Sequence, residues 1–572
     1  MRRRGPRHYS TDPLPPPYRK PGPSSLAEVA ARFGLRGDEL EFHGGRMAKV
    51  SLETLERVAE RPPGKYVVVT SITPTPFGEG KTVHTIGLAM ALCALGRRAI
   101  PTVRQPSTGV ALGLKGGGAG GGRARLFPAE ELNLHATGEA HAVAAATNLL
   151  AAAIDASLFH GNPLGIDPEA ILWRRCLDVN DRALRRVRIG LGIGGVVRET
   201  GFEATAASET MGVLAQTSSR ADLRARLGRM VVAETPAGAP VTAEDLKAAG
   251  AMAALLKDAI RPTAVQTSEG TLALVHAGPF ANVGTGNSSV LADRLALRCA
   301  EFVVTEAGFG ADMGAEKCFN LKCRAGGFRP DAALLVATVR ALKVHAGKIR
   351  VVAGRPLDPA LALPDPAAVE TGCCNLEKQI ENVRLHGLPV VVAINRFPTD
   401  TEEEIGIVRA RALAAGAAAA EISEVFSRGS EGGRALAEAV VRAAEAPPGF
   451  RHLYPLDLPL REKIVLLARR VYGAGRVVFG AGVEETLARY EARGWGRLPV
   501  CIAKTQWSLS HDPNLKGRPE GFDFPVVGVR PFVGAGYVTA FAGEILTMPG
   551  LGSDPAFRRI DVGPDGEVTG LS

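Results

Sequence analysis

Short apolar runs rich in β-branched residues recur along the chain, each close to a segment with helical periodicity. The first run, Lys65–Thr70 (KYVVVT), is followed by turn residues and then by a helical pattern over Thr82–Leu95. Further runs of this kind are Phe302–Thr305, Ala333–Thr338, Val390–Ile394 and Val500–Ala503. Continuous apolar strands beside helices are typical of a parallel sheet covered on both faces. We therefore predict an α/β fold around a mostly parallel sheet.

Two breaks in the pattern predict how the chain divides. Lys348–Ala368 is rich in Pro, Gly and small residues, and Ala446–Gly449 (APPG) ends the Ala-rich helix before it. An Arg- and Pro-rich stretch at the N-terminus has too little apolar content to pack. We predict a disordered basic arm over 1–25, a large α/β domain over 26–350, and two smaller α/β domains over 351–448 and 449–572.

Composition and charge narrow the class of protein. With 572 residues, 46% of them hydrophobic and 22% charged, the chain is expected to be globular. Its net charge of +9 favours anionic partners, whether phosphate ligands, acidic metabolites or nucleic acid. Aromatic residues make up only 5%, which leaves few side chains for stacking on bases. We expect no nucleic-acid partner.

Apolar segments and cysteines indicate in which cellular compartment the protein works. We find no run of about 18 uncharged apolar residues, and the Ala-rich stretch Ala140–Ile154 is too short to span a bilayer. The eight cysteines contain no CxxC pair, so reduced thiols are the default. We expect a cytoplasmic protein without a membrane partner.

The segment TPFGEGKT lies between the first predicted strand and its helix. A G-K-[ST] sequence in a strand–loop–helix context is the P-loop pattern, although Thr75 stands where the strict pattern has its first glycine. Such a loop turns backbone amides toward phosphates, places Lys81 at the β- and γ-phosphates, and lets the Thr82 hydroxyl ligate Mg²⁺. The alternative is a Gly-rich turn with a surface lysine. The large domain over 26–350 is therefore predicted to be P-loop NTPase-like. The residues predicted to bind ATP are Thr75, Pro76, Phe77, Gly78, Glu79, Gly80, Lys81 and Thr82.

A second glycine run, Lys115–Gly122 (KGGGAGGG), closely follows Arg104–Ser107 (RQPS). So many glycines are not expected to form a regular element, but they allow backbone donors to approach an anion without Cβ obstruction. We predict a second phosphate-binding loop at Lys115, Gly117 and Gly118. The alternative is a flexible linker.

Two histidines and a glutamate follow in Asn133–Ala142 (NLHATGEAHA). His135 and Glu139 would share one helix face if the stretch were helical. The spacing of His135 and His141 is not the HExxH spacing that brings two imidazoles to one zinc ion, so zinc is disfavoured. A histidine is more often structural than catalytic, but these two lie just after two candidate anion-binding loops.

Together these motifs resemble the formate–tetrahydrofolate ligase family. The stretches that carry the resemblance occur in the family's order and cover nearly the whole chain after the arm. They are TPFGEGKT, RQPS, LKGGGAGGG, NLHATGEAHA, NLLAAAID, DVNDR, DLKAAGAMAALLKD, VQTSEGTLALVHAGPF, VTEAGFGADMGAEK, NRFPTDT, KTQWSLS and LTMPGL.

The resemblance implies a reaction and its participants. ATP phosphorylates formate to formyl phosphate, and N10 of tetrahydrofolate attacks the formyl carbon to give 10-formyltetrahydrofolate, ADP and phosphate. The resemblance also implies Mg²⁺, a monovalent cation (K⁺ or NH₄⁺) and a homotetramer. Formate is a weak electrophile as its anion, and phosphorylation supplies a leaving group, a transfer that needs positioning and charge neutralisation.

The resemblance also implies roles for individual residues. The catalytic candidates are Lys81, Arg104, His135, His141 and His276, with Arg104 assigned to formyl phosphate. The folate candidates are Phe397 and Phe426, placed against the pterin, and Gln105. The alternative for both phenylalanines is packing in the core.

Several positions near these candidates depart from the family's usual sequence. Gln105 stands where Glu is usual, and Thr108 and Val110 replace Leu and Pro; Gly284–Asn287 (GTGN) stands for AHGC, and His511 for Asp. A charge-assisted hydrogen bond lost at position 105 is worth roughly 1.5–3 kcal/mol. Two alternatives therefore stay open: a paralogue that formylates another acceptor or another folate, and a catalytically weak nucleotide-dependent binding or regulatory protein.

Overall fold

The computed structural model describes residues 24–115, 118–192, 194–352, 357–564, 566 and 568–571. Residues 1–23 of the predicted arm and the candidate Gly117 lie outside the described residues. All five strands expected from the hydrophobic pattern are present within a residue or two of their predicted ends, and the helix expected over Thr82–Leu95 is α3 (Lys81–Ala94).

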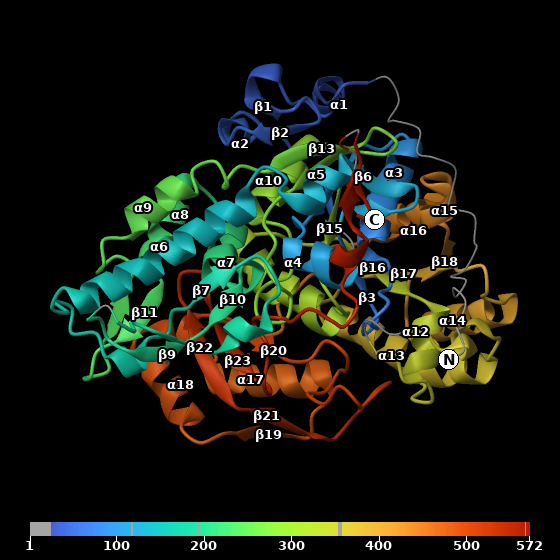
Figure 1. Cartoon of the computed structure of the whole chain (residues 1–572). Helices are drawn as coiled ribbons and strands as arrows, with labels where there is room; N and C mark the ends of the chain where they lie inside the picture. The colour runs from blue at the N-terminus through green and yellow to red at the C-terminus, as the bar shows by residue number, and fades with distance from the viewer. Residues whose placement is uncertain are drawn as a thin grey trace, which may run out of the picture.

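A 12-stranded sheet forms the centre of the molecule (Figure 1). Its parallel part runs in the order β14-β4-β15-β3-β16-β17-β18, and β1, β2, β6 and β13 extend it with antiparallel pairs. The prediction of an α/β fold with a mostly parallel sheet is confirmed. The bounds of the parallel strands are β14 Leu272–Val275, β4 Ala99–Val103, β15 Phe302–Glu306, β3 Lys65–Ser71, β16 Ala332–Ala337, β17 Val390–Asn395 and β18 Ala419–Ser423. The other strands of the sheet are β1 Leu40–His43, β2 Met47–Val50, β5 Gly120–Gly121, β6 Ala124–Phe127 and β13 Thr263–Thr267.

Helices cover both faces of this sheet. On one face, Val67 and Val69 of β3 pack with α3 and α16 (Arg434–Ala444). On the other face, Tyr66 and Val68 belong to a core built with α10, α12, α13 and α14. Because successive strand residues point to opposite faces and both faces are covered, the middle of β3, Tyr66–Val69, is continuously apolar. The bounds of these helices are α10 Val290–Cys299, α12 Val339–His345, α13 Pro366–Arg384 and α14 Glu402–Ala414.

A second core lies beside the sheet and contains α6 (Glu139–Phe159), α7 (Glu209–Gln216), α8 (Arg220–Gly228) and α9 (Ala249–Leu255). The helix α6 has 21 residues and is longer than the stretch read from the sequence. By length and composition alone, Ala129–Phe159 could cross a membrane, a test that core helices also pass. Because Val143, Leu150 and Ile154 are buried in the second core, we interpret α6 as a core helix.

The C-terminal part of the chain has small sheets and a core of its own, which includes Tyr472, Ile502 and Phe524. Its elements are α17 Leu460–Leu467, β19 Arg476–Phe479, α18 Val483–Ala492, β20 Val500–Ala503, β21 Asp523–Val526, β22 Gly528–Phe532, β23 Tyr537–Phe541, β24 Asp561–Val562 and β25 Val568–Thr569. By contrast, β17 and β18 from the predicted second domain join the same sheet as β3. The domain boundaries themselves stay a prediction.

Short elements complete the described fold. The helices are α1 Leu26–Arg32, α2 Glu53–Arg57, α4 Thr108–Val110, α5 Ala129–Leu134, α11 Cys323–Gly326 and α15 Val425–Arg428. The strands are β7 Arg175–Leu177, β8 Val187–Ile189, β9 Arg198–Thr200, β10 Phe202–Ala204, β11 Val231–Glu234 and β12 Pro240–Thr242.

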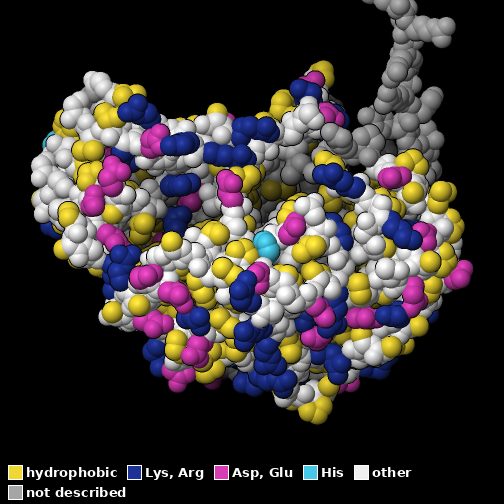
Figure 2. All heavy atoms as spheres, turned by 90° about the horizontal axis from the view of Figure 1, so that it is seen from below, with side chains coloured by type: hydrophobic (Ala, Val, Ile, Leu, Met, Phe, Trp, Pro, Cys, Tyr) yellow, Lys and Arg dark blue, Asp and Glu magenta, His cyan; other side chains and the backbone are white. Residues whose placement is uncertain are grey.

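Seen from below, Lys and Arg side chains border a hollow in the surface (Figure 2), a distribution that favours anionic ligands.

Candidate active site

The phosphate loop candidate connects the carboxyl end of β3 to the start of α3, so the predicted strand–loop–helix context is confirmed. Gly78 and Gly80 have φ angles of 78° and 86°, in the left-handed region that favours glycine. A Cβ at Gly80 would also come within 3.0 Å of Nδ2 of Asn395. Gly80 directly precedes α3, whose first amides lack partners within the helix and therefore suit an anion.

The side chain of Glu79 closes this loop from the inside. Its Oε1 accepts hydrogen bonds from the amide of Thr75 at 2.7 Å and from the Thr75 hydroxyl at 2.8 Å. Its backbone oxygen accepts from Nδ2 of Asn395, at the end of β17, at 3.0 Å. Thr75 thus supplies a hydroxyl that the glycine of the strict pattern could not. Pro76 is half-buried, and Phe77 packs against the core of the sheet.

The cationic end of Lys81 lies against the end of β3. Its Nζ donates to Oγ of Ser71 at 3.2 Å, and the same Oγ lies 3.1 Å from the carbonyl oxygen of Phe309. Thr82 is half-buried in the first turn of α3. Lys81 and Thr82 therefore lie at the start of the helix that follows the glycine loop, as the P-loop pattern predicts.

Arg104 directly follows β4, the second strand from β3 across the sheet. Its Nη2 lies 3.2 Å from Oε1 of Glu306, the last residue of β15, and its Nη1 donates to the carbonyl oxygen of Pro279 at 3.3 Å. A Cβ at Gly308 would come within 3.1 Å of both terminal nitrogens, so the guanidinium lies over this glycine. Its Nε is buried and has no hydrogen-bond partner among the described residues.

Gln105 is buried next to Arg104. Its backbone amide donates to the carbonyl oxygen of Ala277 at 2.7 Å. Its side-chain Oε1 is buried and finds no hydrogen-bond partner in the part of the chain that the structure describes. A buried acceptor left unsatisfied costs free energy, so this oxygen is suited to a donor or a cation from a ligand.

The second glycine run is more ordered than predicted. Gly120–Gly121 form β5, which pairs with β6, so the expectation that no glycine of the run joins a regular element is wrong. The amide of Gly118 donates to Oδ1 of Asn133 at 2.8 Å. Lys115 is the last residue of a π-helical turn, Ala111–Lys115. A hairpin with left-handed glycines at its turn, such as Gly122 with φ of 57°, favours the loop interpretation over a linker.

His135 and His141 form an exposed pair close to this run. Nε2 of His141 lies 3.1 Å from Nδ1 of His135, so one ring donates a hydrogen bond to the other. His135 caps the end of α5, and His141 lies in the first turn of α6. Because a turn separates the two helices, His135 and Glu139 do not share the helix face considered from the sequence.

His276 has a different environment from the other two histidines. It is fully buried, with Nδ1 2.6 Å from Oγ of Ser289 and Nε2 2.7 Å from the carbonyl oxygen of Ala259. Because a carbonyl only accepts, Nε2 carries the proton and Nδ1 accepts from the serine. Burial lowers the pKa of His276, which keeps the ring neutral.

The two phenylalanines assigned to folate lie after neighbouring parallel strands. Phe397 follows β17, and the guanidinium of Arg340 lies 4.2 Å from its ring centre. Phe426 follows β18 in α15, and its side chain is 52% exposed. A Cβ at Gly121 would come within 3.2 Å of the Phe426 ring, so Phe426 lies against the glycine hairpin. Phe426 therefore does not pack as a core residue.

Two of the departures from the family's usual sequence have contacts that explain them. The Thr108 hydroxyl lies 2.9 Å from Oδ2 of Asp178, which also accepts from the Thr108 amide at 2.9 Å. Asn287 is fully buried, and its Nδ2 donates toward the carbonyl oxygens of Glu306 at 3.3 Å and Gly314 at 3.4 Å. Asn287 thus supports the residue that holds Arg104.

Sequence reasoning missed three residues that contact the predicted site residues. These are Ser71 beside Lys81, Glu306 beside Arg104, and Asn395 at the phosphate loop. A signal was present, because all three are the last residues of strands in one parallel sheet, whose carboxyl ends share an edge.

The fold and the site are those of α/β enzymes that place glycine loops and cations at the carboxyl edge of a parallel sheet. A family model described as formate–tetrahydrofolate ligase matches residues 19–572. A formate–tetrahydrofolate ligase of Roseiflexus castenholzii is 54% identical over 549 residues, 96% of this chain and 97% of the relative. One of Saccharopolyspora erythraea is 55% identical over 549 residues, with the same coverage. The chain therefore belongs to the formate–tetrahydrofolate ligase family.

Proposed function

We propose that this chain ligates formate to tetrahydrofolate at the expense of ATP, by way of formyl phosphate, and releases 10-formyltetrahydrofolate, ADP and phosphate. The observation that carries the proposal is the family match over residues 19–572, which includes every loop and charged side chain of the site. The relatives' names supply formate and tetrahydrofolate as substrates.

The phosphate side of the site suits the first step. Phosphoryl transfer to formate depends on positioning and on neutralising charge. The glycine-loop amides and Lys81 would hold the ATP phosphates, and Arg104 would bind formyl phosphate. Glu306 and the Pro279 carbonyl fix the Arg104 guanidinium from one side. Lys115, Gly117 and Gly118 remain the proposed second phosphate contact.

The folate side suits the second step, in which N10 attacks the formyl carbon and phosphate leaves. Phe397 and Phe426 would offer aromatic faces to the pterin. N10 loses its proton in this step, and the exposed His135–His141 pair is the proposed acceptor. For His276 we propose a positioning role, because both of its ring nitrogens are engaged in the interior.

Two cations accompany the proposed reaction. Magnesium would arrive with ATP and be held by the Thr82 hydroxyl, which lies in the first turn after the glycine loop. The buried Oε1 of Gln105, which no donor among the described residues satisfies, fits either a pterin N–H of the folate proposed to bind there or a monovalent cation. A neutral amide oxygen there is a weaker ligand than the carboxylate usual in the family.

Assembly and location follow from the family resemblance and the thiols. A homotetramer is part of the proposal and is measured by light scattering of the purified protein. All eight cysteines are free, as suits a reducing cytoplasm.

The test is release of ADP from ATP, measured with formate alone and with formate plus tetrahydrofolate. The proposal predicts release that requires both, together with 10-formyltetrahydrofolate in equal amount. Formate-dependent release without any response to tetrahydrofolate would instead favour the paralogue with another acceptor. Absence of formate-dependent release would favour the binding or regulatory protein.

A further inference from the structure

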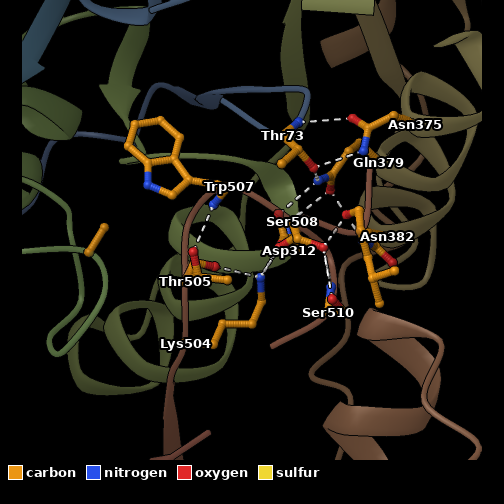
Figure 3. A network of polar contacts seen from close by, with 12 residues as sticks. Thr73, Asp312, Asn375, Gln379, Asn382, Lys504, Thr505, Trp507, Ser508 and Ser510 are labelled. Atoms are coloured by element: carbon orange, nitrogen blue, oxygen red, sulfur yellow. Dashed lines mark hydrogen bonds and ion pairs between the residues drawn. The ribbon is translucent and has the colours of Figure 1, made fainter. Parts of the chain in front are cut away.

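The KTQWSLS motif begins with Lys504, whose side chain connects the C-terminal part of the chain to the large sheet domain. Lys504 follows β20, and its Nζ forms an ion pair with Oδ2 of Asp312 at 2.8 Å (Figure 3). The two side chains are 0% and 2% exposed. The same Nζ donates to the carbonyl oxygen of Thr505 at 3.1 Å and lies 5.1 Å from the ring centre of Tyr472. The proposed function assigns no role to this lysine.

From Asp312, the contacts continue to the phosphate loop. Oδ1 of Asp312 accepts from Nε2 of Gln379 at 2.7 Å, and the Asp312 amide donates to Oε1 of the same side chain at 2.9 Å. Gln379 Nε2 also donates to Oγ1 of Thr73 at 3.0 Å. Asn375 binds Thr73 twice, accepting from its amide at 3.0 Å and donating to its hydroxyl at 2.9 Å. Figure 3 shows these side chains converging on Thr73, two residues before the loop TPFGEGKT.

The segment that contains Asp312 also contacts the surroundings of Lys81 and Arg104, the two cationic side chains proposed for catalysis. Glu306 pairs with Arg104, and the carbonyl oxygen of Phe309 lies 3.1 Å from the Ser71 hydroxyl that receives Lys81. Phe309 has a φ angle of 61°, an uncommon conformation for a bulky residue, which surrounding contacts must maintain. Residues 306–312 therefore link Lys504 to both sides of the phosphate site.

Stability alone does not account for these contacts. Burying a lysine and an aspartate costs several kcal/mol in desolvation, and an apolar pair of similar volume is often as stable or more so. Burial lowers the pKa of Lys504, and the charge of Asp312 opposes this shift. Directional bonds to a buried charge fix a geometry that apolar packing would leave looser.

We propose that Lys504 is a positioning residue through which the C-terminal part of the chain sets the geometry of the phosphate loop. This inference rests on the proposed function, because it concerns the same reaction. It predicts that the ion pair affects catalysis beyond its effect on folding. With the link broken, the loop residues Thr73–Lys81 lose their fixed relation to Arg104, and the transfer step slows.

The test compares Lys504→Met with the double variant Lys504→Met/Asp312→Asn. The asparagine keeps Oδ1 for Gln379 and buries no unpaired charge, so the double variant should regain most of the thermal stability that Lys504→Met loses. We expect kcat to fall at least tenfold in both, with a raised KM for ATP and a KM for tetrahydrofolate within about twofold of wild type.

A matched control is Lys463→Met. Lys463 is equally buried, but its Nζ donates to the backbone carbonyl oxygens of Leu456, Gly496 and Leu498. All three lie within the C-terminal part of the chain. At a temperature where the protein stays folded, its kcat should be unchanged. A double variant with wild-type kcat would overturn the inference and leave Lys504 a structural residue. If Lys504→Met does not accumulate as folded protein, the double variant decides alone. Wild-type protein without formate-dependent ADP release would instead contradict the proposed function.

Discussion

The ammonium group of Lys49 in β2 lies 2.6 Å from Oε1 of Glu139 at the start of α6, and both side chains are buried. The other oxygen of Glu139 accepts from the amide of Ala277 at 3.1 Å. Ala277 has a φ angle of 52°, and its carbonyl oxygen holds the amide of Gln105. The ion pair thus supports the backbone on which Gln105 and Arg104 are placed.

Replacing Lys49 by methionine should destabilise the protein strongly, because Glu139 would stay buried without a counter-charge. Breaking one side of a buried pair costs about 3–5 kcal/mol. The variant Lys49→Met/Glu139→Gln should recover much of this loss. Urea unfolding monitored by circular dichroism measures the free energy of unfolding of both variants. As a control, Arg186→Met breaks an exposed pair with Glu199 and should cost less than about 1 kcal/mol.

Lys81→Ala should abolish turnover while leaving the fold intact, because the lysine supplies charge to the transferring phosphoryl group. We expect kcat to fall by well over tenfold, with an unchanged thermal unfolding curve. The exposed Lys257→Ala is the control, and its kcat should equal that of wild type. A Lys81→Ala enzyme that kept more than about a tenth of the rate would have lost less than ~1.4 kcal/mol, too little for the assigned role.

Phe426→Ala should raise the KM for tetrahydrofolate and leave the KM for ATP nearly constant, because the exposed face of the ring can stack on a ligand. The loss should be about 2- to 12-fold, as for an aromatic contact of roughly 0.5–1.5 kcal/mol. Phe557→Ala removes another exposed ring and serves as the control. Equal KM values in all three proteins would show that Phe426 does not face folate.

Gln105→Glu should lower the KM for tetrahydrofolate with little change for ATP and formate, since a carboxylate gives the folate side a charge-assisted partner. The gain is up to one or two decades, from roughly 1.5–3 kcal/mol. Steady-state kinetics with each substrate varied in turn provides the measurement. A worse KM would mean that the carboxylate is buried without a partner, and would support another acceptor.

Glu209 should make the protein less stable as the pH rises from about 5 to 8. Burial raises its pKa to about 8, while the amides of Gly534 and Ala535 donate to Oε1 and partly oppose the shift. Glu209 ionises near pH 4.5 in the unfolded chain and near pH 8 in the folded protein. Between these values the folded state holds a proton that the unfolded state has lost, so the free energy of unfolding falls as the pH rises across that window.

The variant Glu209→Gln should therefore show a smaller fall in melting temperature between pH 5 and pH 8 than wild type. The amide oxygen of glutamine still accepts the two N–H bonds. Glu485→Gln, on an exposed helix position, should retain the wild-type pH dependence. Identical slopes in all three proteins would show that Glu209 is not protonated in the folded state.

The sequence predicted those parts of the site that are local in the chain. The run KYVVVT and the motif TPFGEGKT placed the strand, the glycine loop and the helix correctly, because neighbouring residues determine a strand–loop–helix unit. The pairs Arg104–Glu306 and Lys49–Glu139 escaped prediction, because strand order brings together residues that are far apart in the chain. The family resemblance supplied roles, but it could not show that His276 has both nitrogens engaged or that Phe426 is exposed.

The strand order of the central sheet has a consequence for biosynthesis. β3 leads into the candidate phosphate loop, but its two neighbours, β15 and β16, begin only at residues 302 and 332. At roughly 5–20 residues per second, a ribosome needs on the order of 10 to 50 seconds to supply the first of them. During that interval the nascent chain carries a largely apolar strand with both edges open, a form prone to aggregate. The yield of folded protein in the cell should therefore depend on how Lys65–Ser71 are shielded until β15 and β16 have been made.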